Sequence, residues 1–179
     1  MATEVRLRDG TPALTWALLP EDREQIAQGY EELAPESQFH RFLAAVPHLT
    51  DSMLDHLVDE VDGVDHVALV LFVFDEEHVG EPAGVARMIR YPDDPTAADV
   101  AVTVAEAYRG RGVASALLDQ LKIERPKGVT HVLTEVAGDN PAALAMLRRL
   151  GPTTVGATQV NVIEVSVELP EPDETSPTP

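Results

Sequence analysis

The 179-residue sequence has no cysteine, few aromatic residues and no long apolar run. Without cysteine the chain can form no disulfide, no thiolate nucleophile and no cysteine-ligated zinc site. No apolar run reaches the roughly 18 residues that a membrane-spanning helix needs. Residues 1–4 lack the basic start and apolar stretch of a signal peptide. These absences predict a cytoplasmic protein with no membrane partner.

Basic side chains are also scarce, because 13 Lys and Arg against 31 Asp and Glu leave a net charge of -18. Such a field repels phosphate backbones, so nucleic acid is excluded as a partner. The same field attracts a cation such as a lysine side chain or a polyamine, although surplus acid also serves solubility alone. An anionic cofactor would need a local device to overcome the field, and backbone N–H groups at a helix start provide one.

The overall composition is that of a globular protein, with 44% hydrophobic and 25% charged residues. The length suits one compact domain, which we predict over residues 1–169. Residues 170–179 are acidic, rich in proline and without apolar side chains, which predicts a disordered tail. The oligomeric state is left open.

Hydrophobic periodicity divides the chain into a helical N-terminal third and an alternating remainder. Helices are predicted over residues 20–33, 36–46, 50–61, 111–124 and 141–150. Strands are predicted over residues 5–8, 13–18, 66–74, 82–91, 98–105 and 129–136, with one or two more in 155–169. The nearly continuous apolar run in 66–74 is typical of a central strand.

A glycine loop lies between the strand at 98–105 and the helix that follows it. It reads Arg109-Gly110-Arg111-Gly112-Val113-Ala114-Ser115. Glycine lets the backbone approach a ligand closely, and the unpaired N–H groups of a first helical turn point in one direction. We therefore predict that these residues cradle a diphosphate, with added positive charge from the two arginines.

The sequence of this loop also permits other interpretations. A Gly-Arg-Gly tripeptide alone also fits a tight turn with exposed arginines. A P-loop requires Lys and then Ser or Thr after its last glycine, and a dinucleotide fold requires three spaced glycines after an early strand. Neither pattern is present.

The loop resembles the acetyl-CoA signature of GNAT acetyltransferases, since Arg-x-x-Gly-x-Ala over residues 109–114 follows the family's Gln/Arg-x-x-Gly-x-Gly/Ala. A second stretch, 139–151, resembles the family's Asn-x-x-Ala segment and closing Leu-Gly. The resemblance implies an α/β (α+β) fold with a mixed central sheet of about six to seven strands flanked by helices. It also implies acetyl-CoA as co-substrate and Asn140 as a cofactor contact, while Asn140 serves as a helix N-cap as well.

Across residues 5–152 the sequence further resembles the acetyltransferase domain of bacterial Pat-type protein-lysine acetyltransferases. Matching stretches include 5–8, 20–23, 33–43 and 98–102. This resemblance implies a protein lysine as acceptor. It carries no expectation about the ligand-controlled regulation that such enzymes often have.

Acetyl transfer requires a neutral amine, so a lysine with a pKa of about 10.4 must give its proton to a base. The resembling enzymes use a glutamate early in the fourth strand, and Asp99 occupies that place, one carbon shorter. The shorter side chain favours a relayed water. Alternation along the strand places Asp99, Ala101 and Thr103 on one face. Glu106 is a second candidate base; a surface carboxylate is the alternative for both.

The resemblance also assigns Val102, Thr103 and Val104 to the cofactor, because the family holds the thioester carbonyl against a backbone N–H of this strand. Many members have a general-acid tyrosine seven residues after the asparagine, where this chain has Leu147. No other residue clearly takes that role. We predict no metal, since no histidines show the i, i+4 spacing of a helical metal site.

The leading hypothesis is an acetyl-CoA-dependent N-acetyltransferase in which a deprotonated primary amine, that of a protein lysine, attacks the thioester directly. A small amine such as a polyamine or aminoglycoside is an alternative acceptor, and the acyl chain is left open. A non-catalytic acyl-CoA sensor is the other alternative, because Asp99 and Leu147 depart from the family pattern. We also predict that Gly112→Val weakens acetyl-CoA binding with the fold intact, through intrusion into the phosphate site.

Overall fold

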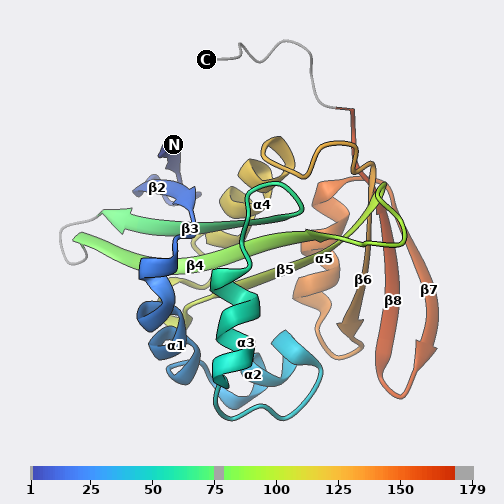
Figure 1. Ribbon diagram of the computed structural model, residues 1–179, viewed down its shortest axis with the longest axis horizontal. Coiled ribbons are helices and arrows are strands. Elements are labelled where there is room, and N and C mark those ends of the chain that lie inside the picture. Colours follow the sequence, from blue (N-terminus) through green and yellow to red (C-terminus); the bar gives the residue numbers. More distant parts are fainter. Residues whose placement is uncertain (1, 75–78, 172–179) are drawn as a thin grey trace.

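A single mixed sheet organises the chain in the computed structural model, which describes residues 2–74 and 79–171 (Figure 1). The strands run in the order β1-β2-β3-β4-β5-β6-β8-β7. Only β5 and β6 are parallel; the other neighbours are antiparallel. The bounds are β1 Thr3–Arg6, β2 Pro12–Ala17, β3 His66–Phe74, β4 Val79–Arg90, β5 Ala97–Val104, β6 His131–Ala137, β7 Thr153–Gln159 and β8 Val162–Glu168.

The predicted α/β architecture is confirmed, but the described sheet has eight strands where about six to seven were expected. The difference arises at the end of the chain, where 155–169 holds a hairpin. Val160 and Asn161 form its turn with φ values of 45° and 64°. Asparagine tolerates this left-handed region better than most residues, whereas a β-branched valine is unusual there.

Helices cover both faces of the sheet. They are η1 Pro20–Asp22, α1 Arg23–Glu31, α2 Pro35–Phe42, α3 Asp51–Leu54, the π-helical η2 Asp55–Asp59, η3 Glu106–Tyr108, α4 Val113–Ile123 and α5 Pro141–Leu150. Figure 1 shows α3 in front of the sheet and α4 behind it. No helix in the described part of the chain is both long and apolar enough to cross a membrane.

The apolar run of β3 is explained by burial on both faces of the sheet, as predicted for a central strand. Every residue from His66 to Val73 is buried. One alternating set, which includes Leu69 and Leu71, packs in the larger core with α4 and α5. The other set, which includes Val70 and Phe72, packs in a smaller core with Leu57 and other residues of the N-terminal helices.

Helix ends differ from the prediction where the backbone turns left-handed. The helix expected over 36–46 ends at Phe42, because Leu43 has a φ of 52°. The helix expected from residue 111 begins at Val113, after Gly112 with a φ of 97°. The Thr50 cap is confirmed, since its hydroxyl accepts a hydrogen bond from the Met53 N–H at 3.3 Å. Most of the predicted tail, residues 172–179, lies outside the described residues.

Candidate active site

A cavity of about 1220 Å³ opens where β5 and β6 separate. The two parallel strands pair only through Ala97 with His131 and Ala98 with Val132. Beyond these pairs their facing edges line the cavity, through 99–104 of β5 and 133–137 of β6. Backbone groups along such an edge lack partners in a sheet ladder and can bind a ligand inserted between the strands.

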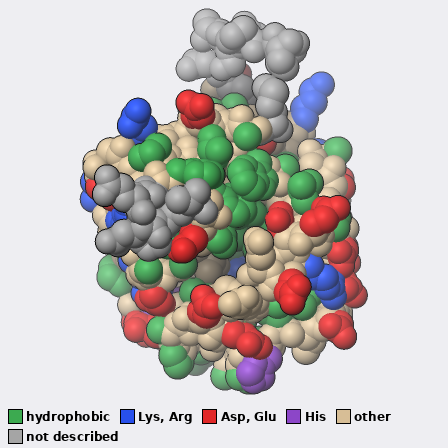
Figure 2. All heavy atoms as spheres, turned by 90° about the vertical axis from the view of Figure 1, so that its left-hand side faces the viewer, with side chains coloured by type: hydrophobic (Ala, Val, Ile, Leu, Met, Phe, Trp, Pro, Cys, Tyr) green, Lys and Arg blue, Asp and Glu red, His purple; other side chains and the backbone are tan. Residues whose placement is uncertain are grey.

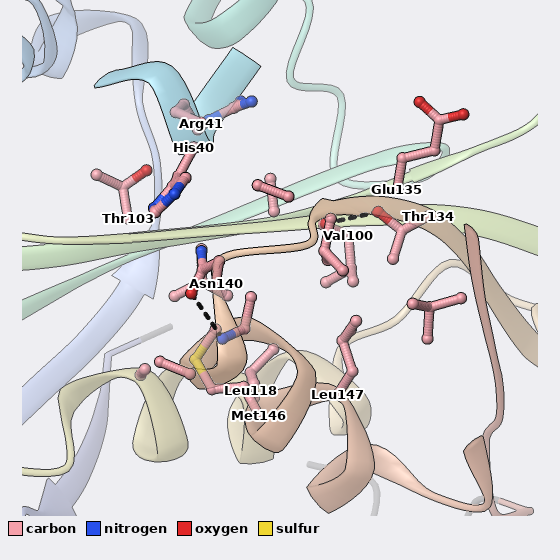
Figure 3. A pocket seen from close by; sticks show the side chains of 18 of the residues that line it. His40, Arg41, Val100, Thr103, Leu118, Thr134, Glu135, Asn140, Met146 and Leu147 are labelled. Atoms are coloured by element: carbon pink, nitrogen blue, oxygen red, sulfur yellow. Dashed lines mark hydrogen bonds between the residues drawn. The ribbon is translucent and has the colours of Figure 1, made fainter. Parts of the chain in front are cut away.

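The cavity has an apolar side and a charged side, on opposite faces of the sheet. Figure 3 shows Leu118, Met146 and Leu147 below β5, and His40 and Arg41 of α2 above it. The apolar side belongs to the core under α4 and α5, into which Val100 also packs. The cavity therefore runs through the split in the sheet.

The glycine loop and the first turn of α4 form one end of the cavity. Arg109, Gly110, Gly112, Val113, Ala114 and Ser115 line it. Gly110 has a φ of 75°, and a side chain there would meet nothing within 4 Å. The amides of the first turn of α4 are unpaired within the helix and carry the positive end of its dipole. This end has the features of the predicted anion cradle.

Gly112 is required for a reason other than the one predicted. A Cβ added to it would lie 3.1 Å from both the backbone nitrogen and the Cβ of Arg8. Arg8 N–H donates a hydrogen bond to the Arg111 carbonyl at 3.0 Å, which seats the N-terminal hairpin against the loop. The expectation that Gly112→Val spares the fold is therefore wrong, since the added side chain crowds this hairpin and must adopt a positive φ.

The two arginines of the loop bind different partners. Arg111 donates to the Asp9 carboxylate at 2.7 Å and to the Thr11 hydroxyl at 2.8 Å. Hydrogen bonds from Thr11, and then from Arg111, lower the pKa of Asp9 to about 2. Arg111 is not among the residues that line the cavity, and its guanidinium instead holds the N-terminal hairpin against the loop. Arg109 does line it and donates to the Ser37 hydroxyl at 2.6 Å.

Glu106, one of the two candidate bases, ties α2 to the loop. Its carboxylate accepts from the Ser37 hydroxyl at 2.8 Å and pairs with Arg109 at 3.0 Å. The Ser37 hydrogen bond is the main cause that lowers the pKa of Glu106. Its side chain is outside the cavity lining, and a carboxylate held in this way is a poor proton acceptor. The structure thus shows Glu106 linking α2 to the loop, and its role as a base stays a prediction.

Asp99 lies at the start of the split, one residue beyond the last pair between β5 and β6. It is half-buried and lines the cavity. Val100, Val102 and Val104 pack against the larger core, which leaves Asp99 on the opposite face. Burial, followed by the charges of Asp99 and Glu135, raises the pKa of Tyr91, whose hydroxyl donates to the Leu133 carbonyl at 2.9 Å.

Asn140 and Leu147 line the cavity from the side of α5. The Asn140 side chain accepts from the Ala143 N–H at 3.0 Å, so its capping role is confirmed. Leu147 is 5% exposed and offers no proton to a leaving group. Tyr108, which also lines the cavity, is buried and donates to Glu81 at 2.8 Å. Within the described ranges, no group of three or more His, Cys, Asp and Glu could hold a metal ion.

Sequence reasoning missed the α2 side chains and the carboxylates of the last strands as site residues. Ser37, His40 and Arg41 line the cavity from α2, in a stretch that had been noted only for its resemblance to the Pat-type enzymes. Glu135 and Glu164 line it from β6 and β8, where they face each other across the strands. No local signal marks these carboxylates, because their place depends on the split in the sheet.

Acidic side chains are not confined to the cavity. Figure 2 shows the face at the left of Figure 1, with Asp and Glu spread over its lower half and hydrophobic side chains gathered higher up. Part of the negative charge is therefore distributed as expected for solubility. The carboxylate of Asp99, which lines the cavity, is favourable to an amine.

The split sheet, the glycine loop at the start of α4 and the capping asparagine define an acetyltransferase site of the GNAT type. The model of the Acetyltransferase (GNAT) family matches residues 26–151, and the chain belongs to this family.

Among curated proteins, Acetyltransferase Pat of Mycolicibacterium smegmatis is 32% identical over 170 residues, covering 94% of this chain and 49% of the relative. An acetyltransferase of Pseudomonas aeruginosa is 28% identical over 81% of this chain and 77% of its own length. The chain thus spans about half the length of the mycobacterial relative.

Solved structures show the same fold. The GNAT domain of S. lividans PAT superposes with a TM-score of 0.82 at 28% identity, covering 94% of this chain and 97% of the other. The yncA protein of Salmonella typhimurium, solved with its cofactor acetyl-CoA, has a TM-score of 0.67 at 19% identity, covering 93% of this chain and 98% of the other.

Proposed function

We propose that this protein transfers the acetyl group of acetyl-CoA to the side-chain amine of a protein lysine. The observation that carries the proposal is the cavity through the split sheet, which joins the glycine loop at one end to Asp99. Similarity to the Pat acetyltransferases supports the protein acceptor. The acidic wall of Asp99, Glu135 and Glu164 supports a cationic one.

The residues at the α4 end suit the cofactor. The amides of 113–115 and the guanidinium of Arg109 would bind the diphosphate. The apolar wall of Leu118, Met146 and Leu147 would exclude water from the acyl arm. Backbone N–H groups in 102–104 would donate to the thioester carbonyl as negative charge develops on it. Asn140 would contact the cofactor from the side of α5.

Asp99 would accept the proton of the acceptor ammonium, directly or through one water. The neutral nitrogen would attack the carbonyl carbon of the thioester to form a C–N bond, and it would lose its second proton to solvent as the C–S bond breaks. The sulfur would leave with the electron pair and take a proton from solvent, since Leu147 has none to give. The products are an amide and free CoA.

The first test is binding of acetyl-CoA. At 100 times its dissociation constant the ligand should stabilise the fold by about 2.7 kcal/mol and raise the melting temperature by several degrees. An unchanged melt would contradict the cofactor site.

The second test is turnover, followed by release of free thiol. Acetyl-CoA is presented with a lysine-rich protein and, separately, with polyamines and aminoglycosides. Acetylated lysines found by mass spectrometry support the proposal, and turnover of small amines alone overturns the acceptor. Binding without turnover of any amine would favour the acyl-CoA sensor.

A further inference from the structure

Arg41 is a cation in the cavity wall with no anion bonded to it among the described residues. It lies on α2, is half-buried and lines the cavity. Its guanidinium carbon lies 4.6 Å from the centre of the Phe42 ring. Across residues 2–74 and 79–171 its nitrogens form no hydrogen bond or ion pair, although a guanidinium carries five N–H donors.

A second guanidinium lies deeper on the same face of the sheet. Arg87 of β4 is 5% exposed and donates to the Leu57 carbonyl at 2.6 Å, with His66 Nε2 at 3.4 Å. In the described structure it too has no carboxylate partner. Burial, and then the charge of Arg41, lowers the pKa of Arg87 to about 9. The region therefore carries positive charge in a protein with a large surplus of acids.

An unpaired, partly desolvated guanidinium is costly, so its place in a binding cavity needs an explanation. Burial lowers the pKa of Arg41, and the Asp99 carboxylate opposes this effect from a position outside ion-pair distance. A ligand anion that entered the cavity would remove the cost. A carboxylate suits the planar guanidinium because both its oxygens can be bonded at once.

The position of Arg41 along α2 indicates which ligand supplies the anion. Ser37, one turn earlier, bonds Arg109 at the cofactor end. Arg41 lies one turn beyond, and Asp99 is the carboxylate that acts on it. Figure 3 shows Arg41 and Glu135 on the same side of β5, away from Asn140 and the apolar wall. The guanidinium thus belongs to the acceptor half of the cavity.

We propose that Arg41 binds a carboxylate of the acceptor, so that the acceptor carries an anionic group beside the amine that is acetylated. This inference rests on the proposed function. The amine lies toward Asp99 and Glu135, and the carboxylate pairs with Arg41. Either of two groups supplies this carboxylate. One is an Asp or Glu side chain next to a target lysine, and the other is the α-carboxylate of a free amino acid.

The test uses two matched pairs of acceptors. One pair is a lysine peptide with glutamate beside the lysine and the same peptide with glutamine; the other is free lysine and lysine amide. The protein should prefer the carboxylate member of at least one pair by about tenfold or more in kcat/KM, as expected for a charge-assisted hydrogen bond. The pair that shows the preference identifies the source.

Variants then assign the preference to the guanidinium. Arg41→Gln should lower kcat/KM for the carboxylate member about ten times more than for its neutral partner. Arg41→Lys keeps the charge and should retain part of the preference for the carboxylate acceptor. This variant replaces Arg41→Gln in the test if Arg41→Gln fails to fold. Arg148 is an exposed arginine of α5 outside the cavity lining. Arg148→Gln is therefore the control and should leave kcat/KM unchanged for both acceptors.

Equal losses for both members of each pair, or no preference in the unaltered protein, would overturn the inference. Failure of the proposed function is distinguishable, because no amine would then be turned over. In that case titration with N-acetylglutamate and its uncharged diamide still tests the subsite. The carboxylate subsite is supported if N-acetylglutamate binds to the unaltered protein but not to Arg41→Gln. It is refuted if N-acetylglutamate does not bind to the unaltered protein.

Discussion

The two ends of the cavity are built in different ways. The cofactor end comes largely from one continuous segment, 102–115, whose backbone conformation and helix start supply the binding groups. The acceptor end is assembled from side chains of α2, β5, β6 and β8, which are far apart in the sequence. An end built from backbone tolerates changes of side chain as long as φ is kept. An end built from side chains depends on each of them and can change its ligand by single substitutions.

The largest expected effect is a loss of catalytic rate at the acceptor end without a loss of cofactor binding. Asp99→Asn removes the base and keeps the shape, so kcat should fall about 10²- to 10⁴-fold. The dissociation constant of acetyl-CoA, measured by calorimetry, should stay unchanged because the cofactor end is intact. A fall below tenfold would place the base at another residue.

The next effect concerns the backbone of the cofactor end. Alanine at Gly110 or Gly112 must adopt a positive φ, which costs about 1–2 kcal/mol in either case. Gly112→Ala should cost more because its Cβ also meets Arg8 at 3.1 Å, whereas Gly110 has open space. Urea denaturation of both variants measures the difference. Equal losses would mean that Arg8 moves away freely.

The buried His66 should make the fold sensitive to acid. Burial, and then Arg87, lowers the pKa of His66 to about 4, below its ordinary 6.5. Because the folded pKa is the lower one, the unfolded chain binds the proton first, and stability is lost as the pH falls from 6.5 toward 4. The loss is on the order of 1–3 kcal/mol.

Urea denaturation at pH 7 and pH 4.5 checks this expectation. His66→Gln should reduce the difference between the two pH values, and the exposed His48→Gln serves as the control. If His66→Gln leaves the difference unchanged, other groups cause the acid sensitivity.

The smallest expected effect compares two helix caps. Asn140→Ala and Thr50→Ala each remove a side-chain cap and should each cost about 1 kcal/mol of stability. Only Asn140 lines the cavity, so only its variant should also weaken acetyl-CoA binding. Equal binding by both variants would limit Asn140 to capping.

Local signals in the sequence predicted much of the fold and located the glycine loop that lines the cavity. The apolar run of β3, the Thr50 cap and the glycine loop each depend on neighbouring residues, and each was located correctly. The partners of Glu106 and Arg111 were not predicted, because Ser37 and Asp9 lie about 70 and 100 residues away in the sequence. No pattern within the loop distinguishes Arg109, which lines the cavity, from Arg111, which holds the hairpin.

By itself the sequence determined where strands and helices form and where a helix start could bind an anion, because periodicity, capping and glycine conformation act over a few residues. Only the tertiary structure decided that β5 and β6 part after their first pairs, and that Arg41, Asp99 and Glu135 line the same cavity. These residues are distant along the chain, so they come to one cavity only when the packed cores set the path of each strand.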